Sequence, residues 1–67
     1  MTEAKHKIVF DYYSDKDATI VKNDNDYPVY FYNKEGKFCM MLEANQQAVV
    51  EYKLGFDDFS EIRGAND

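Results

Sequence analysis

The chain has 67 residues and a net charge of −5, with 13 acidic and 8 basic side chains. A chain of this length forms one domain with a thin core, because so small a domain buries only about 60% of the surface that its unfolded form exposes. The single cysteine, Cys39, excludes an internal disulfide, so self-association is the remaining common support. The acidity and the single arginine argue against direct nucleic-acid binding.

The first half of the chain predicts three strands separated by two polar turns. Residues 7–13 and 18–22 are rich in β-branched and aromatic residues, and the first of these segments alternates apolar and polar side chains. Between them, residues 14–17 have turn chemistry, as do residues 23–26 farther along. The segment Val29–Tyr32 is apolar or aromatic on both faces, which predicts a strand that is buried on both sides or meets a partner.

A hairpin is expected next, with residues 33–37 as its loop and Gly36 free to adopt positive φ. Its second strand is Phe38–Leu42, the longest apolar run in the chain, which is far shorter than the roughly 20 residues that a membrane span needs. The expected faces of this strand are Phe38, Met40 and Leu42 on one side and Cys39 and Met41 on the other.

The last third of the chain is harder to interpret. Residues 43–54 fit a strand, which Val49, Val50 and Tyr52 favour, but they also fit a helix that ends at Gly55. Asp58 and Glu61 match a capping box, which predicts a short helix that ends by Gly64.

The expected fold is therefore mainly β (α+β): a small antiparallel sheet of four or five strands with one short C-terminal helix. We expect residues 1–67 to form a single domain with frayed ends at about 1–5 and 64–67. The N-terminal residues are polar and lack an apolar stretch of signal-peptide length, so the expected location is the cytoplasm, without membrane contact.

Residues 31–60 resemble the YegP-like domains, a small bacterial family of unestablished biochemical function. The resemblance lies in Phe31, the turn to Gly36, the pattern Phe38-x-Met40-x-Leu42-x-Ala44, Val49-Val50, and Gly55-Phe56 entering a helix start. The chain departs from the family where Gln46-Gln47 replace the usual glycine of the second turn, and its expected helix is shorter and less basic. The resemblance implies an antiparallel sheet with a helix packed across it, and it brings no catalytic residues.

No group of residues in the sequence predicts catalysis, a metal site or a cofactor. His6 is the only histidine and is expected at the solvent-exposed edge of the first strand, whereas Cys39 is expected as a small buried apolar residue. Asp24, Asp26 and Glu35 imitate the ends of a calcium loop, but the ligand and the glycine required between them are absent. We therefore expect no enzymatic activity.

Six tyrosines are more than a core this thin can bury, and tyrosine is enriched at protein interfaces because it joins a large ring to a polar tip. An alternative is that the rings cover a half-exposed sheet face. The candidate interface residues are Tyr30, Tyr32, Tyr13 and Tyr52, together with the acidic pairs Asp24 and Asp26, and Asp57 and Asp58.

These features predict a small acidic interaction module, a regulator or inhibitor of the kind encoded by phages or mobile elements, which binds a basic-surfaced protein. Mimicry of DNA by its carboxylates is one version of this hypothesis. A homo-oligomeric structural protein is the second hypothesis. A small-ligand-binding domain or an enzyme is the third and the least favoured.

Overall fold

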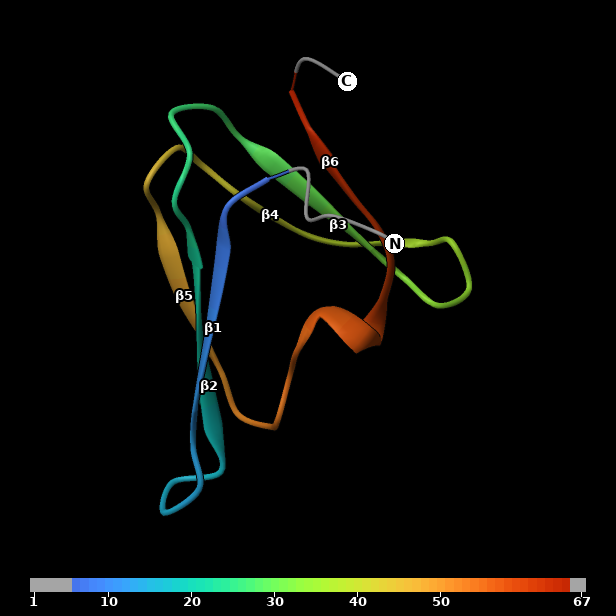
Figure 1. Ribbon diagram of the computed structural model, residues 1–67. Helices are drawn as coiled ribbons and strands as arrows, with labels where there is room; N and C mark the ends of the chain where they lie inside the picture. The colour runs from blue at the N-terminus through green and yellow to red at the C-terminus, as the bar shows by residue number, and fades with distance from the viewer. Residues whose placement is uncertain (1–5, 66–67) are drawn as a thin grey trace.

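The computed structural model describes residues 6–65, which form six antiparallel strands in two three-stranded sheets (Figure 1). The strands are β1 (Ile8–Tyr13), β2 (Ala18–Asn23), β3 (Val29–Asn33), β4 (Phe38–Leu42), β5 (Gln47–Val50) and β6 (Phe59–Gly64). A single 3-10 turn, η1 (Phe56–Asp58), precedes β6. Residues 6–65 contain no α-helix, and so none long and apolar enough to cross a membrane. The domain is all-β.

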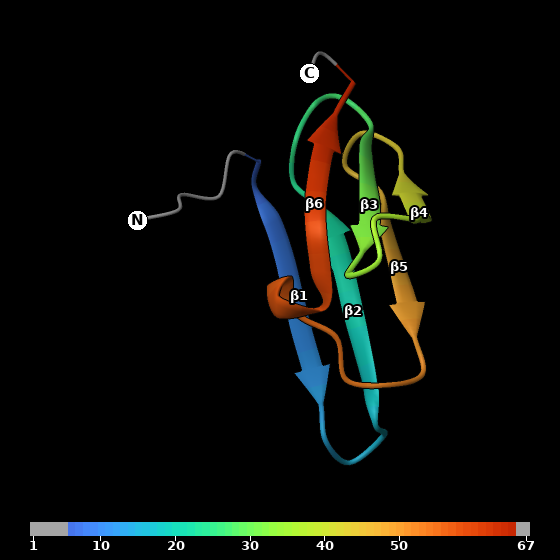
Figure 2. The same ribbon diagram turned by 90° about the vertical axis from the view of Figure 1, so that its right-hand side faces the viewer.

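The two sheets lie face to face, with strand orders β1-β2-β5 and β4-β3-β6 (Figure 2). Two local hairpins, β1–β2 and β3–β4, supply two strands of each sheet. The third strand of each sheet comes from farther along the chain, because β5 pairs with β2 and β6 pairs with β3. Each sheet therefore has one inner face toward the core and one outer face.

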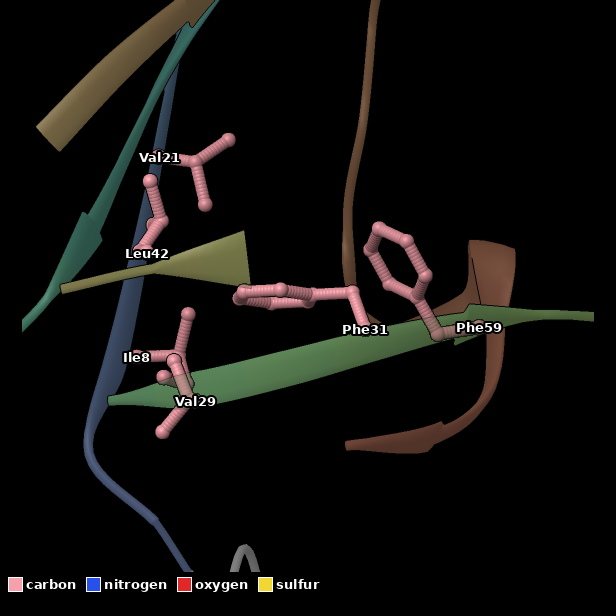
Figure 3. Packing of buried hydrophobic residues seen from close by; sticks show 6 residues of the cluster. All are labelled: Ile8, Val21, Val29, Phe31, Leu42 and Phe59. Carbon is pink, nitrogen blue, oxygen red and sulfur yellow. The ribbon is translucent and has the colours of Figure 1, made fainter. Parts of the chain in front are cut away.

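The core fills the space between the sheets (Figure 3). Alternate residues of each strand point inward, as the two-residue period of a strand requires. The buried apolar residues are Ile8, Val21, Val29, Phe31, Leu42 and Phe59. The rings of Phe31 and Phe59 lie 5.1 Å apart between centroids, so β3 and β6 contribute the largest side chains.

The ambiguous segment 43–54 is a strand over Gln47–Val50 and not a helix, which confirms the favoured interpretation. Beyond it the chain is held by Thr19, which is fully buried. The Thr19 hydroxyl donates to the Tyr52 carbonyl at 2.7 Å and accepts from the Leu54 amide at 3.0 Å. The backbone pairing of β2 with β5 ends at Val50, and these two hydrogen bonds hold the chain to β2 beyond that point.

The predicted C-terminal helix is wrong, because residues 59–64 form β6. The capping-box chemistry is present three residues earlier than expected: Gly55 is the N-cap of η1, and its amide donates to Asp58 Oδ2 at 2.9 Å. It supports one 3-10 turn only. Beyond that turn, burial of Phe59 and pairing with β3 favour an extended chain over a helix. The single sheet expected from the sequence is thereby replaced by two.

Two residues of the segment expected to fray, Gly64 and Ala65, lie within the described part of the chain. Gly64 is a buried residue of β6, and the Ala65 amide donates to the Pro28 carbonyl at 3.0 Å. The other residues expected to fray, 1–5 and 66–67, lie outside the described part.

The expectation that His6 is exposed is also wrong, since only 7% of it is exposed. Its Nδ1 lies 2.7 Å from the Tyr27 hydroxyl, and the two rings meet edge to face. Gly64 makes this burial possible, because a Cβ at its position would lie 2.6 Å from His6 Cε1.

A buried asparagine joins the loops at one end of the sandwich. Asn23 has no exposed surface, and its Nδ2 donates to the carbonyls of Tyr27 (2.8 Å), Leu42 (3.2 Å) and Glu43 (2.9 Å). Its Oδ1 accepts from both the amide and the Nδ2 of Asn25. We call these bonds the Asn23 clasp. The clasp ties the β2–β3 loop to the end of β4, so it fixes one sheet against the other.

Candidate interaction surface

The outer face of the β4-β3-β6 sheet gathers large apolar side chains. Tyr30 and Tyr32 alternate along β3 with the buried Val29 and Phe31, so both tyrosines point outward. Residues directly opposite on β4 and β6 share this face. Tyr30 lies opposite Met41, and Tyr32 lies opposite Phe38. We call Tyr30, Tyr32, Phe38 and Met41 the aromatic face.

A β-bulge places Phe38 on this face, contrary to the expected alternation. The β3–β4 register runs from Phe31↔Met40 to Tyr32↔Phe38, so Cys39 is an extra residue in β4. Met40 and the buried Leu42 still contribute to the core, as expected. Phe38 instead points outward and is 58% exposed, and Cys39 is exposed rather than buried.

Phe38 lies between the two tyrosines. Its ring centroid is 6.5 Å from that of Tyr30 and 6.0 Å from that of Tyr32, and the second contact is edge to face. Such aromatic pairs contribute about 0.5–1.5 kcal/mol beyond area burial. Met41 next to them is 38% exposed. The aromatic face is therefore a contiguous apolar patch with two phenol groups, the composition that is typical of interface centres.

A charged pair borders this patch on β6. The Arg63 guanidinium carbon lies 5.7 Å from the Tyr32 ring centroid, and Arg63 Nε donates to Glu61 Oε2 at 2.7 Å. The two side chains are 55% and 49% exposed, so the ion pair adds little to stability. Its effect is to hold a cation against the edge of the aromatic face.

Two predicted interface tyrosines do not lie on the aromatic face. Tyr13 ends β1 and Tyr52 follows β5, so both belong to the other sheet, and both are exposed.

The third exposed tyrosine, Tyr12, has a local partner. Its hydroxyl donates to Asp17 Oδ1 at 2.9 Å across the β1–β2 turn. This hydrogen bond, with smaller contributions from desolvation and from the negative charge of Asp17, raises the pKa of Tyr12 above its ordinary value of 10.0. The Lys53 ammonium lies 5.5 Å from the same ring. Tyr12 thus makes its contacts within its own sheet.

The predicted acidic residues lie at the two ends of β3. Asp24 and Asp26 belong to the loop before β3, whereas Asp57 and Asp58 belong to η1, next to the pair Asn33↔Phe59 at its far end. Asp58 already accepts the Gly55 amide, so its carboxylate has a structural role. The structure therefore does not bring the two acidic pairs together. It places one pair beyond each end of β3.

Among residues 6–65, no three His, Cys, Asp or Glu side chains lie close enough to hold a metal ion. No family model, curated protein or solved structure matches the chain. The resemblance of residues 31–60 to YegP-like domains therefore stays a prediction. The helix that it implies is replaced here by η1 and β6.

Proposed function

We propose that this protein is a non-enzymatic interaction module, a regulator or inhibitor, which binds a protein partner through the aromatic face. The observation that supports this most is the outward turn of Phe38. A bulge that exposes 58% of a phenylalanine beside two tyrosines and a methionine is unfavourable for an isolated domain and favourable for binding.

The acidic residues beyond the two ends of β3 suggest the kind of partner. Carboxylates flank the aromatic face at both ends, and the chain carries a net charge of −5. Complementary charges raise the association rate and select among partners, whereas a desolvated aromatic centre supplies most of the affinity. The partner that fits best is a protein with an apolar patch between groups of Lys or Arg.

The test compares Phe38→Ala with Val49→Ala as a matched control. Val49 is 62% exposed on the outer face of the other sheet, so both changes remove a largely exposed apolar side chain. Each variant and the wild type, tagged in the same way, is used to isolate partners from the native host. The affinity of each isolated protein is then measured with purified components.

We expect Phe38→Ala to weaken binding at least ten-fold, because truncating a central aromatic costs about 2 kcal/mol or more. Val49→Ala should bind as the wild type does. Circular dichroism establishes that both variants are folded. A partner that binds folded Phe38→Ala as tightly as the wild type would show that the aromatic face is not the binding surface.

A further inference from the structure

The outward side chains of the β4-β3-β6 sheet form two rows across its three strands. Side chains that lie directly opposite one another on paired strands point to the same face. The first row is Met41, Tyr30 and Arg63, and the second row is Phe38, Tyr32 and Glu61. In each row the β4 position is apolar, the β3 position is a tyrosine and the β6 position is charged.

These two rows match each other when two copies of the chain pack face to face. A two-fold axis that lies between the faces and runs across the strands sets the first row of one copy against the second row of the other. The contacts between copies, each formed twice, are then Met41 with Phe38, Tyr30 with Tyr32, and Arg63 with Glu61. Apolar, tyrosine and charged positions therefore all meet a position of matching chemistry.

The other face-to-face alignment does not match. The strands of this sheet lie in the order β4-β3-β6 (Figure 2), so an axis parallel to the strands would place β4 of one copy against β6 of the other. Phe38 and Met41 would then cover the charges of Glu61 and Arg63. Desolvating a charge against an apolar side chain costs free energy that no new contact offsets. The strand order thus selects the axis that runs across the strands.

The outer face of the other sheet does not match itself. The strand pairing gives its two rows as Val9, Lys22 and Gln47, and Asp11, Ile20 and Val49. The same two-fold axis would set Val9 against Asp11, Lys22 against Ile20, and Gln47 against Val49. Each contact would press an apolar side chain onto a polar one. Of the two outer faces in residues 6–65, only that of the β4-β3-β6 sheet is therefore complementary to a second copy.

The ion pair within each copy also favours this alignment. Glu61 and Arg63 lie 2.7 Å apart and are both about half exposed. Together they form a small dipole along β6, and the two-fold axis places the dipoles of the two copies antiparallel. Each charge then lies near an opposite charge of the second copy. Packing of the faces partly buries this group of four charges, so salt screens it less than an exposed pair.

We propose that the protein forms a two-fold dimer in which the outer faces of two β4-β3-β6 sheets pack against each other, with the axis across the strands. The dimer covers the aromatic face of both copies, so self-association and partner binding exclude each other. That competition rests on the proposed function, whereas the dimer itself does not.

The dimer should be weak and form at high concentration. Its two rows are far fewer than the about 20–30 residues a side of a standard interface, and the net charge of −5 on each copy opposes association. A basic partner meets no such repulsion and gains from the same charge, so it displaces the second copy.

The main experiment mixes two opposite charge variants and follows association by sedimentation equilibrium over a range of concentrations. Glu61→Arg gives a copy with two arginines in β6, and Arg63→Glu gives a copy with two glutamates. Each variant alone brings like charges together, so we expect its dimer to be at least ten-fold weaker than that of the wild type. In an equal mixture every charged contact between copies is attractive, and we expect association at least as strong as that of the wild type. A structural role of the ion pair within one copy cannot produce this rescue.

Asp11→Arg and Lys22→Glu are the matched controls on the other outer face. They change the net charge by the same amounts, and we expect each, alone or mixed, to dimerise within about three-fold of the wild type. Circular dichroism establishes that all four variants are folded. A control pair that behaves as the β6 pair does would show that net charge alone drives association, and would overturn the proposal.

A second measurement uses the wild type alone. In a mixture of ¹³C-labelled and unlabelled protein, isotope-filtered NMR detects only contacts between copies, and we expect one between the Met41 methyl group and the Phe38 ring. Contacts between copies that avoid these residues would overturn the proposal. So would a wild type that stays monomeric at its highest soluble concentration, or a mixture of the two folded β6 variants that associates no better than either alone. Because none of these measurements involves another protein, failure of the dimer leaves the proposed function standing.

Discussion

Replacement of Asn23 by aspartate changes one donor group into an acceptor at the centre of the Asn23 clasp. In the wild type, Nδ2 donates to three backbone carbonyls, two of them at the end of β4, while Oδ1 accepts from Asn25. An aspartate of the same shape keeps the acceptor and loses the donor. Its second carboxylate oxygen then faces the carbonyl oxygens of Tyr27, Leu42 and Glu43 with no exposed surface.

The expected loss can be worked out from this geometry. A buried charge without a partner costs about 3–5 kcal/mol, and carbonyls left without a donor are part of that cost. At about 0.05–0.15 kcal/mol per residue, a 67-residue domain has a free energy of unfolding of about 3–10 kcal/mol. We therefore expect Asn23→Asp to lose about 3–5 kcal/mol at pH 7, which removes much of the stability of the domain.

The loss should depend on pH. Burial raises the pKa of the introduced carboxyl above the unfolded value of about 3.9, so the unfolded state releases its proton first. The penalty for the charge is therefore absent below about pH 4 and grows as the pH rises through that value. A protonated acid also donates one hydrogen bond to the carbonyls. Near pH 4 we expect the loss to shrink to about 1–3 kcal/mol.

Urea denaturation followed by circular dichroism at pH 4 and pH 7 measures both losses. Asn33→Asp is the matched control, because Asn33 Oδ1 accepts from the amides of Glu35 and Lys37, which an aspartate preserves. We expect the control to be as stable as the wild type at both pH values. Equal losses in the two variants at pH 7, or a loss in Asn23→Asp that does not shrink at pH 4, would refute the reasoning.

Three further predictions concern single contacts. Gly64→Ala should lose about 1–3 kcal/mol, because its Cβ would lie 2.6 and 2.8 Å from two aromatic ring carbons, whereas Gly55→Ala, with nothing within 4 Å, should be neutral or stabilising by thermal denaturation. Thr19→Val should lose about 1–3 kcal/mol in urea, because the carbonyl and amide that the hydroxyl satisfies are left without it; an unchanged midpoint would contradict this. Asp17→Asn should lower the pKa of Tyr12 toward 10 in an NMR titration of its ring. Because the pKa is raised in the folded state, the hydrogen bond from the Tyr12 hydroxyl to Asp17 stabilises the fold below pH 10, and this contribution is lost as the pH rises further. An unchanged pKa in the variant would exclude the bond.

The local signals in the sequence predicted most strands and turns correctly. Alternation in residues 7–13 and the two-sided apolar character of Val29–Tyr32 correspond to β1 and β3, and Gly36 adopts the positive φ expected of the hairpin loop. Tyr30 and Tyr32, which the sequence named as interface candidates, point outward because side chains alternate along β3. These features depend on neighbouring residues alone, so one sequence is enough to read them.

The errors all depend on how one segment pairs or packs against another. β6 was taken for a helix because Asp58 and Glu61 carry a local helix signal, while its pairing with β3 joins residues about 30 positions apart. The bulge at Cys39, which adds Phe38 to the aromatic face, exists only relative to the register of β3. His6 is buried because a glycine 58 positions later leaves room for its ring. A capping motif or an alternating pattern cannot reveal any of these.

β5 and β6 lie far along the sequence from the strands with which they pair, and this has a consequence for how the chain folds. Hairpins such as β1–β2 and β3–β4 close through loops of four residues and form in about 1–10 μs, whereas β2–β5 and β3–β6 join strands across much longer stretches of chain. The entropy of closing those stretches must be lost before any contact compensates for it. We therefore expect a rate-limiting step in which the two outer strands dock, with folding in milliseconds to seconds. Until that step is complete, the edge of β3 that later pairs with β6 has no partner, and it can pair wrongly with another segment or another chain.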